Sequence, residues 1–530
     1  MNQAQLQQKQ ERLRQLQEEE RQLRLQLQVQ EHAATYQVEL AWPARIVDSN
    51  GNAPRTNNEL IQHRLLESGV LYEVPVRVGA TVESTNAFIQ DLEKTGCFNS
   101  VRVEVGQGVS DEDASTRVQK QLKITLDEKR WYRVNAGAGV KTDGWLRPET
   151  AVNDGFLPTA EIDVSVGLQN LTGCLDKTDL QYTLDTRSLA TLSLSHEQPL
   201  YRMLPGSLRG WLLEQDYGSK YAFVAKAMVD TLDFERTRSY KEFQRSLSLR
   251  VCNQHSLASP EYTPDLYYGV EWSLLSRDLV PRRQSKMPYA MDASPEVVSQ
   301  AGPSLKHSIL AEFRSNGELL DHPYSPTGGV EMHGSAEVAV PPGSVGFVRC
   351  NGGFGIHMPL LQSLSVHSIF NAGYLKALSF GGLCRPPTLS DRYYVGGPLR
   401  FRGFVPAGIG PRTKHGGSST PGGDAVGGDF FYTATAMASI TPTSGIQSVD
   451  SLVESLGVRL FSFASAGTCV GVVAHTPLSA IARSTRVSLG VGLATTALGP
   501  RLEATYAWPW RYGPADARQN AQFGFGFSFG

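Results

Sequence analysis

Few side chains in this 530-residue chain are spaced as catalysis requires. Residues 526–530 (GFSFG) match the GxSxG elbow of serine hydrolases, but that elbow places its serine between a strand and a helix, and no helix-forming segment follows here. Residues 195–197 (Ser-His-Glu) are adjacent, and adjacent side chains of a strand point to opposite faces, so they cannot form a proton relay. Neither a Walker A phosphate loop nor an HExxH motif occurs. We therefore expect that the chain is not an enzyme.

The charged and sulfur-containing residues give no sign of a metal, cofactor or nucleic-acid site. Lys and Arg number 50 against 52 Asp and Glu, so no excess of positive charge would gather nucleic acid. The cysteines lie far apart and form no CxxC pair, which argues against a zinc site and a disulfide scaffold. They are Cys97, Cys174, Cys252, Cys350, Cys384 and Cys469. We expect no metal ion and no cofactor.

One cation is distinguished by its surroundings. Arg402 lies in the segment VGGPLRFRGF, where Gly396 and Gly397 precede it and Gly403 and Phe404 follow it. Glycines permit the backbone conformations of tight turns. Taken alone, the segment predicts a Gly-Gly turn that leads into a basic, aromatic loop.

The region that must position this loop, residues 131–530, is dominated by alternating segments. Apolar residues alternate with small hydroxyl and amide side chains, as in 180–184 and 190–195, and no long amphipathic helix is evident. A soluble sandwich usually exposes charges, whereas a membrane barrel places its apolar face against lipid and its polar face in a wet lumen. About 400 residues, at roughly 25 per strand and turn, predict a transmembrane β-barrel of about sixteen strands. Aromatic residues that fit an interfacial girdle are Tyr267, Tyr268, Tyr393, Tyr394, Trp508 and Trp510.

Residues 38–129 have the pattern of a small α/β module. A short strand precedes two amphipathic helices, the first capped by Asn57 or Asn58 and the second by Ser84 or Thr85. Two alternating strands then complete a β-α-α-β-β order. A sheet of this order keeps at least one open edge, which can accept an extended peptide as an added strand.

Residues 1–36 are rich in Gln, Glu, Arg and Leu and contain neither Gly nor Pro, so they predict a helical arm. Leucines recur at two heptad positions, but polar residues interrupt the seam. A weak coiled coil and a solvated helix without a partner both remain open. The arm has no apolar stretch like that of a secretory signal peptide.

The segment SDRYYVGG at 390–397, followed by Arg402-Gly403-Phe404, resembles the signature of the BamA-type outer-membrane assembly superfamily. Members join N-terminal POTRA modules to a sixteen-stranded barrel, and the β-α-α-β-β module resembles one POTRA module. The pair Gly427 and Gly428 resembles a second Gly-Gly element of the family. The resemblance extends over nearly the whole chain beyond the arm.

The resemblance is greatest to the mitochondrial branch of this superfamily. Only one POTRA-like module precedes the barrel, and the last strand is similar to a mitochondrial sorting signal, with Gln522, Gly524, Phe527 and Phe529 at its characteristic positions. This implies the central barrel of the mitochondrial sorting and assembly machinery, placed in the mitochondrial outer membrane with its POTRA module in the intermembrane space. Its implied partners are β-barrel precursor proteins, accessory subunits of that complex and outer-membrane lipids, with no nucleic acid.

The resemblance further implies that the loop around Arg402 folds back into the lumen. A charged arginine there needs a partner, usually a carboxylate. The sequence departs from the bacterial pattern, because Ser465 stands where bacterial relatives have aspartate. Asp429 and Glu503 are the possible partners.

The barrel is expected to close by pairing its first strand, at 131–140, with its last, at 522–529. Glycines weaken packing at this seam, and an opened seam in lipid exposes backbone groups that a client strand can satisfy. We expect an insertase that templates β-barrel precursors at this lateral seam. The alternative is a protein-conducting channel of the same fold, used for secretion or import.

Overall fold

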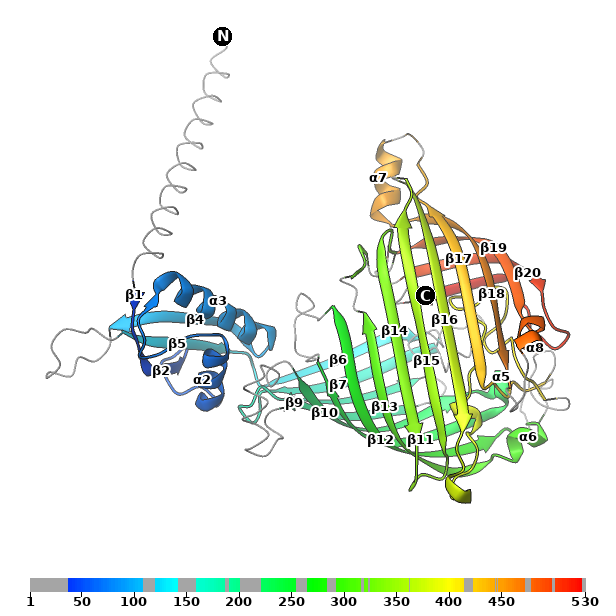
Figure 1. Cartoon of the computed structure of the whole chain (residues 1–530), viewed down its shortest axis with the longest axis horizontal. Helices are drawn as coiled ribbons and strands as arrows, with labels where there is room; N and C mark the ends of the chain where they lie inside the picture. Colours follow the sequence, from blue (N-terminus) through cyan, green and yellow to red (C-terminus); the bar gives the residue numbers. More distant parts are fainter. Residues whose placement is uncertain are drawn as a thin grey trace, which may run out of the picture.

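The computed structural model combines a small α/β module with a large antiparallel sheet that curls into a barrel (Figure 1). The predicted helical arm at 1–36 lies outside the residues that the structure describes. Those residues are 37–107, 120–141, 159–185, 190–200, 221–253, 265–283, 292–315, 319–322, 325–361, 363–413, 423–443, 445, 447–471, 478–497 and 501–526.

The α/β module packs two helices on a three-stranded sheet in the order β2-β5-β4, in which β2 runs parallel to β5 and β4 antiparallel to it. Its core is apolar and closed, with Ile61, Leu65, Phe88, Leu92 and Ile124 fully buried. The predicted β-α-α-β-β order is present among the longer elements, and two additional two-residue strands, β1 and β3, pair with each other in a separate sheet. Its elements are β1 (Gln37–Val38), β2 (Leu40–Asp48), α2 (Asn58–Glu67), β3 (Val76–Arg77), α3 (Val78–Lys94), β4 (Phe98–Gln107) and β5 (Lys120–Glu128).

The two helices of the module differ in how they begin. Asn57 caps α2 as predicted, because its side chain accepts a hydrogen bond from the Glu59 backbone N–H. The predicted cap of α3 at Ser84 or Thr85 is wrong, since α3 begins at Val78. A hydroxyl residue is tolerated inside a helix when it bonds a carbonyl one turn back. Thr85 Oγ1 does so, donating to the carbonyl four residues earlier at 2.6 Å.

The barrel sheet has sixteen antiparallel strands, each paired with its neighbour in sequence, from β6 to β21. The predicted strand number is confirmed. The strands are β6 (Tyr132–Lys141), β7 (Thr159–Gln169), β8 (Lys177–Asp185), β9 (Ala190–Pro199), β10 (Ala222–Asp233), β11 (Tyr240–Cys252), β12 (Leu266–Pro281), β13 (Gly302–Ser315), β14 (Gly329–Ala339), β15 (Phe347–Pro359), β16 (Leu364–Ala377), β17 (Phe430–Ile440), β18 (Arg459–Val470), β19 (Arg486–Thr495), β20 (Arg501–Arg511) and β21 (Ala521–Gly526).

Short helices occupy the connections of the barrel. In Figure 1, α5, α6 and α8 lie at the end of the barrel away from the module. Among the described residues, no helix is both long and apolar enough to cross a membrane. The connecting helices are α5 (Glu235–Arg238), α6 (Pro295–Val298), η4 (Phe380–Gly382), η5 (Leu389–Asp391), α7 (Gln447–Ser455) and α8 (Leu478–Arg483).

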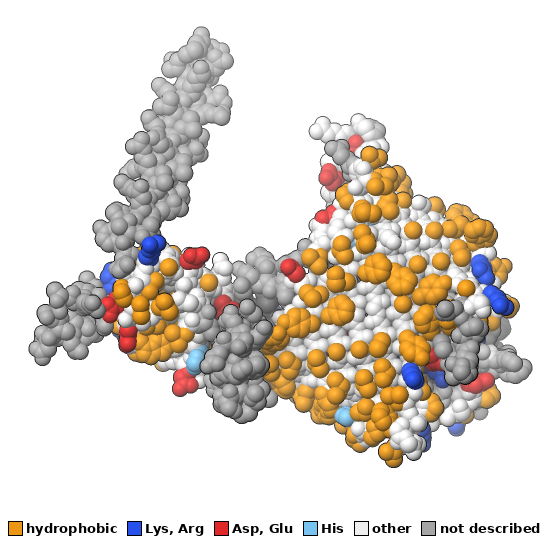
Figure 2. Space-filling model, in the orientation of Figure 1, with side chains coloured by type: hydrophobic (Ala, Val, Ile, Leu, Met, Phe, Trp, Pro, Cys, Tyr) orange, Lys and Arg blue, Asp and Glu red, His pale blue; other side chains and the backbone are white. Residues whose placement is uncertain are grey.

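The two faces of the barrel sheet differ in polarity. On the barrel face in view in Figure 2, hydrophobic side chains are numerous and charged ones are few. Exposed apolar side chains of the barrel strands include Leu247, Val270 and Ile309. Charged side chains such as Glu337 and Arg501 are buried on the inner face. This alternation is the one that a lipid exterior and a polar lumen require.

The predicted aromatic girdle is only partly correct. Tyr268, Trp508 and Trp510 are exposed, as an interfacial position requires. Tyr267 and Tyr393 are instead buried, because their hydroxyls have partners inside the barrel. The hydroxyl of Tyr267 donates to Glu312 at 3.2 Å, and that of Tyr393 donates to a strand carbonyl.

The turn between β7 and β8 fastens the barrel to the module. Leu175 in this turn is fully buried and belongs to the core of the module. Asn170 Nδ2 donates to Thr56 Oγ1 at 2.7 Å. Gly173 has a φ of 75°, and a Cβ there would lie 2.5 Å from the carbonyl oxygen of Arg55, so glycine is required. The module is therefore docked on the barrel wall next to β6.

β6 and β21 stand at the two ends of the sheet order, and no ladder joins them in the part of the chain that the structure describes. The predicted closure by pairing of the first and last strands is thus not seen there. β21 is short, with six residues paired to β20. Phe527 and Phe529 of the predicted sorting signal lie outside the described residues.

Candidate functional site

The long connection between β16 and β17, residues 378–429, folds into the barrel, and we refer to it as the lumenal loop. Its turn around Arg402 depends on glycine, because Gly396, Gly397 and Gly403 have φ values of 131°, 108° and 92°. The Gly397 N–H donates to the Phe404 carbonyl at 2.9 Å and closes the turn. A Cβ on Gly403 would lie 2.6 Å from Ser488 Oγ, so this turn packs directly on the barrel wall.

Arg402 forms a bidentate ion pair with Glu503 of β20. Arg402 Nε and Nη2 donate to the two carboxylate oxygens at 2.7 and 3.0 Å. Both side chains are almost fully buried, with 2% and 0% of their surface exposed. Arg501 Nε donates to the same carboxylate at 3.1 Å, so one anion serves two cations. The ring of Phe463 lies 5.3 Å from the Arg402 guanidinium and covers it.

Of the two predicted partners of Arg402, the structure places Glu503 against it. Asp429 lies where β17 begins, and its backbone bonds both neighbouring strands: its N–H donates to the Val470 carbonyl, and its carbonyl accepts from Leu375. Ser465, at the position of the bacterial aspartate, shares a hydrogen bond of 2.9 Å with Thr435.

The last strand also holds the turn. Gln522 Oε1 accepts from the Gly403 N–H at 2.7 Å, and Gln522 Nε2 donates to the Phe404 carbonyl at 2.8 Å. A Cβ on Gly524 would lie 3.0 Å from the Leu399 side chain, so the loop packs closely on this strand. The structure thus brings together two sets of residues that the sequence predicted separately, the Arg-Gly-Phe turn and the described part of the last strand.

The second Gly-Gly element, Gly427 and Gly428, lies against residues 392–394, which directly precede the first one. Gly428 and Tyr393 exchange two backbone hydrogen bonds of 2.9 Å. Gly427 has a φ of 71°, and a Cβ there would lie 2.8 Å from both Arg392 Cβ and the Tyr394 ring. The glycines therefore allow the end of the loop to return beside its own beginning.

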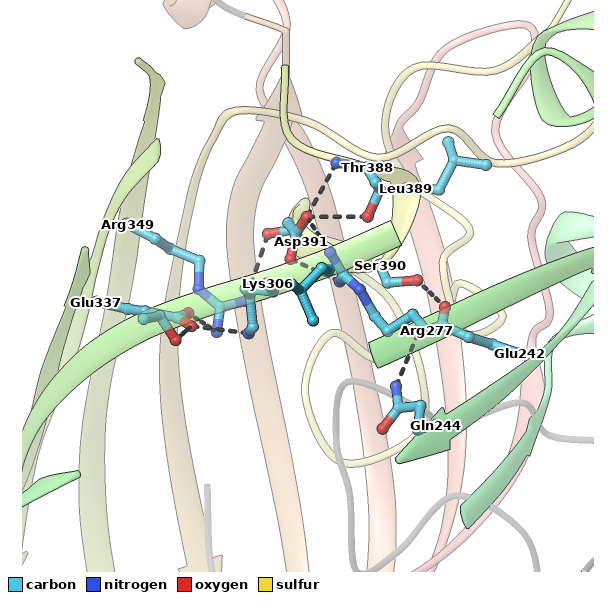
Figure 3. A network of polar contacts seen from close by, with 12 residues as sticks. Glu242, Gln244, Arg277, Lys306, Glu337, Arg349, Thr388, Leu389, Ser390 and Asp391 are labelled. Atoms are coloured by element: carbon cyan, nitrogen blue, oxygen red, sulfur yellow. Dashed lines mark hydrogen bonds and ion pairs between the residues drawn. The ribbon is translucent and has the colours of Figure 1, made fainter. Parts of the chain in front are cut away.

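A second anchor, which the sequence did not predict, attaches the loop to the opposite wall. Asp391 accepts hydrogen bonds from Arg277 Nη1 and Nη2 of β12 at 2.8 and 3.0 Å, and both residues are buried (Figure 3). Thr388 caps the short helix η5 by donating to Asp391 through its N–H and its hydroxyl. Ser390 donates to Glu242 of β11. Loop and wall are thus joined by a network of charge-assisted bonds.

The network continues along the wall to β15. Glu337 of β14 accepts from Lys306 of β13 at 2.7 Å and pairs with Arg349 of β15 at 2.9 Å (Figure 3). Arg349 also donates to the backbone carbonyl of Asp391 at 3.3 Å. Lys306 and Arg349 therefore share the Glu337 carboxylate, as Arg402 and Arg501 share that of Glu503.

Asp424 holds the returning part of the loop. Its carboxylate is buried and accepts from Ser239 Oγ at 2.5 Å and from the Ser294 N–H at 2.9 Å. These two residues lie next to α5 and α6, in connections at the end of the barrel away from the module. The segment 414–422, within the Gly-rich stretch of the loop, lies outside the described residues.

Comparisons with known proteins agree with this architecture. A model of the Omp85 superfamily domain matches residues 175–529, well over half of the chain. The chain is 28% identical over 289 residues to a SAM50-like protein of Schizosaccharomyces pombe, covering 52% of this chain and 56% of that protein. It is 27% identical over 241 residues to the human sorting and assembly machinery component 50 homolog, covering 43% of this chain and 45% of that protein. The chain thus spans about half the length of the curated relatives it matches.

Among solved structures, BamA from Haemophilus ducreyi lacking POTRA domains 1–3 is similar in fold. The TM-score is 0.65 at 15% identity, covering 92% of this chain and 84% of that one. The fold, the sixteen strands and the matched domain point to one family. The chain therefore belongs to the Omp85 superfamily and is a SAM50-type barrel of the mitochondrial outer membrane.

Proposed function

We propose that the chain is a non-enzymatic insertase, which folds β-barrel precursor proteins and inserts them into the mitochondrial outer membrane. One observation carries the proposal: the lumenal loop, through Arg402 with Glu503 and Gly403 with Gln522, holds β20 and β21 from inside, while no described ladder joins β21 to β6. The last strands are therefore fixed in place although their outer edge has no described partner.

The mechanism that we propose follows from the chemistry of a strand edge in lipid. An unpaired backbone N–H or C=O costs several kcal/mol in the hydrocarbon region, so an open edge there is satisfied only by another strand. A client strand that pairs with β21 or β6 replaces hydrogen bonds by equivalent ones. Such an exchange needs neither a nucleotide nor a cofactor. A brace that keeps β21 in register preserves the template while the client adds further strands.

The proposed partners follow from the same geometry. Precursors would reach the seam from the side of the α/β module, which we assign as a POTRA-like module in the intermembrane space and which is docked beside β6. The other proposed partners are accessory subunits of a sorting and assembly complex and outer-membrane lipids. The names of the fungal and human relatives support this assignment.

The proposal is tested by site-specific crosslinking in isolated mitochondria. A photoreactive residue at exposed Val134 in β6 or Phe523 in β21 should crosslink to the last strand of an arriving porin precursor. The matched control is exposed Ile309 in β13, in the middle of the sheet, where no crosslink is expected. Equal crosslinking at all three positions would contradict strand templating.

Depleting the protein from cells distinguishes the proposed insertase function from the alternative, a protein-conducting channel. An insertase predicts loss of porin assembly while soluble matrix proteins are imported at the normal rate. A protein-conducting channel predicts that a soluble substrate arrested in transit crosslinks to the lumenal loop. The latter result would replace the insertase by the channel.

A further inference from the structure

An arginine lies on the outer face of the barrel, where the strands otherwise present mainly apolar side chains. Arg245 of β11 stands between Phe243 and Leu247 on this face, and all three side chains are exposed. Its cross-strand neighbours are Val229 of β10 and Ser276 of β12. Among the residues that the structure describes, no hydrogen bond or ion pair of the Arg245 guanidinium is present. A charge that faces lipid requires a partner or access to water.

Arg245 marks the border of the apolar band, at the end of the barrel that carries α5 and α6. Two residues nearer to this end along the strands, Asp278 of β12 lies beside Phe243 on the same face. Nearer still, Asp233 and Lys241 form an ion pair of 3.8 Å with each other. In the opposite direction, the outward side chains of β11 are apolar. The guanidinium therefore lies where a bilayer passes from hydrocarbon to headgroups, a level that long cationic side chains favour.

A groove of about 450 Å³ crosses the outer face beside Arg245. Ala227 of β10 makes the hollow, because its small side chain stands in register between Leu194 of β9 and Leu247 of β11. Leu274 of β12 continues this apolar row. Arg245 lines the groove on the side nearer to the headgroups. An apolar groove with a cation at that side has the form that an acyl chain attached to a phosphate requires.

The two charges beside the groove have the order of a zwitterionic lipid headgroup. In such a lipid the phosphate follows the glycerol, and the ammonium group lies beyond the phosphate. Arg245 borders the groove, and Asp278 lies two residues nearer to the end of the barrel, with no ion pair of its own in the described part of the chain. A guanidinium matches phosphate oxygens, and a carboxylate accepts from an ammonium group. An anionic headgroup would instead place a second negative charge beside Asp278.

We propose that this groove binds one zwitterionic glycerophospholipid. Its acyl chain fills the hollow over Ala227, its phosphate pairs with Arg245 and its ammonium group pairs with Asp278. The bound lipid supplies the partner that a cation at the edge of the hydrocarbon requires. The site is independent of the insertase proposal, because it requires only a barrel that lies in a membrane.

The test is native mass spectrometry of the delipidated full chain, titrated in detergent micelles with a defined lipid. Dioleoylphosphatidylethanolamine should bind as one molecule, and more tightly than dioleoylphosphatidylglycerol, which has the same chains and an anionic headgroup. Arg245→Gln removes a charge-assisted contact with the phosphate and should weaken binding of both lipids about tenfold or more. Arg245→Lys keeps the charge and should recover most of the affinity. The matched control Arg511→Gln, at the exposed end of β20 and outside the groove, should bind as the unmodified protein does.

Two further variants test the headgroup and the chain separately. Asp278→Asn should weaken binding of the ethanolamine lipid and strengthen binding of the glycerol lipid, a reversal that a loss of structure would not produce. Ala227→Leu fills the hollow and should weaken binding of both lipids. Its control is Ala225→Leu, on the same face of β10 but outside the groove. Thermal unfolding of each variant shows that a lost signal does not reflect a lost fold.

Four results would overturn the site. Equal binding of the ethanolamine lipid by the unmodified protein and by Arg245→Gln would mean nonspecific adhesion of lipid. Equal binding of the two phospholipids by the unmodified protein would exclude the pairing with Asp278. Equal binding of dioleoylglycerol, which lacks a charged headgroup, would show that neither charge takes part. A photoreactive residue in place of Ala227 that crosslinks to a polypeptide in mitochondria would make the groove a protein interface instead.

Discussion

At the scale of single residues, the carboxylate of Glu503 is the point on which the loop depends, because two buried arginines share it. Removing one partner of a buried ion pair typically costs about 3–5 kcal/mol, since the other charge stays desolvated. Here Glu503→Gln would remove the carboxylate that Arg402 and Arg501 share.

We predict that Glu503→Gln lowers the thermal unfolding temperature and slows client assembly, and that Arg402→Lys has a smaller effect of the same sign. Lysine keeps the charge but cannot form the two parallel bonds of the guanidinium. Thermal unfolding in detergent and porin assembly in mitochondria measure both effects. The control is Arg250→Lys, because Arg250 pairs with Glu271 and Glu312 on the distant wall of β11 to β13 and is about a third exposed, so lysine, which keeps the charge, should change little. Unchanged assembly by Glu503→Gln would contradict a functional role of the brace.

The chemistry of Arg402 was predictable, but its partner was not. A charge between glycines and aromatic residues required a carboxylate, and the sequence offered Asp429 and Glu503. Choosing between them requires the register of β20, which lies 101 residues beyond Arg402. The pair of Arg277 and Asp391, 114 residues apart, was missed because an inward charge on a strand resembles any other polar residue of an alternating pattern.

At the scale of elements, the turn between β7 and β8 orients the module toward the seam. Leu175 adopts a φ of 60°, which is unfavourable for any residue other than glycine. Its side chain is completely buried in the core of the module. Burial of a leucine offsets that strain, because a fully buried side chain of this size contributes about 1.5–3 kcal/mol.

Leu175→Ala should therefore release the module from the barrel without unfolding either. Leucine-to-alanine changes in cores cost about 2–5 kcal/mol, and here the cost acts on the contact between the two units as well as on the module. Hydrogen exchange should become faster in the turn and in α2, while the barrel strands stay protected. The matched control is Leu171→Ala in the same turn, where the side chain is about half exposed. Equal exchange in both variants would show that the turn does not hold the module.

Strand number and alternation followed from the sequence because period two is a local property. The residue at which α3 begins, and whether β6 and β21 pair at the seam, could not be predicted from the sequence. Thr85 can serve either as a cap or inside a helix, and only packing decides between these positions. Pairing between β6 and β21 joins the two ends of the sheet, so no local pattern reports it.

At the scale of the whole molecule, the lumenal loop crosses the barrel. One anchor joins Asp391 to Arg277 on β12, and the other joins Arg402 to Glu503 on β20, eight strands further along the sheet. A closed barrel gains stiffness from its ladder, but the described strands form no ladder at the seam. The loop supplies a connection between the two walls that does not depend on the seam. The barrel can then present an open edge and still keep its last strands in position.

If the loop acts as one brace, its two anchors must be energetically coupled. We predict that Asp391→Asn and Arg402→Gln each lower the thermal unfolding temperature, and that the double variant loses clearly less than the sum of the two. Once one anchor is released, the other holds a loop that no longer spans the lumen, so its loss costs less. The control pairs either variant with Arg250→Gln on the β11–β12 wall, where the effects should add. Additive losses for Asp391→Asn and Arg402→Gln would show two independent contacts, and the loop would then not connect the walls mechanically.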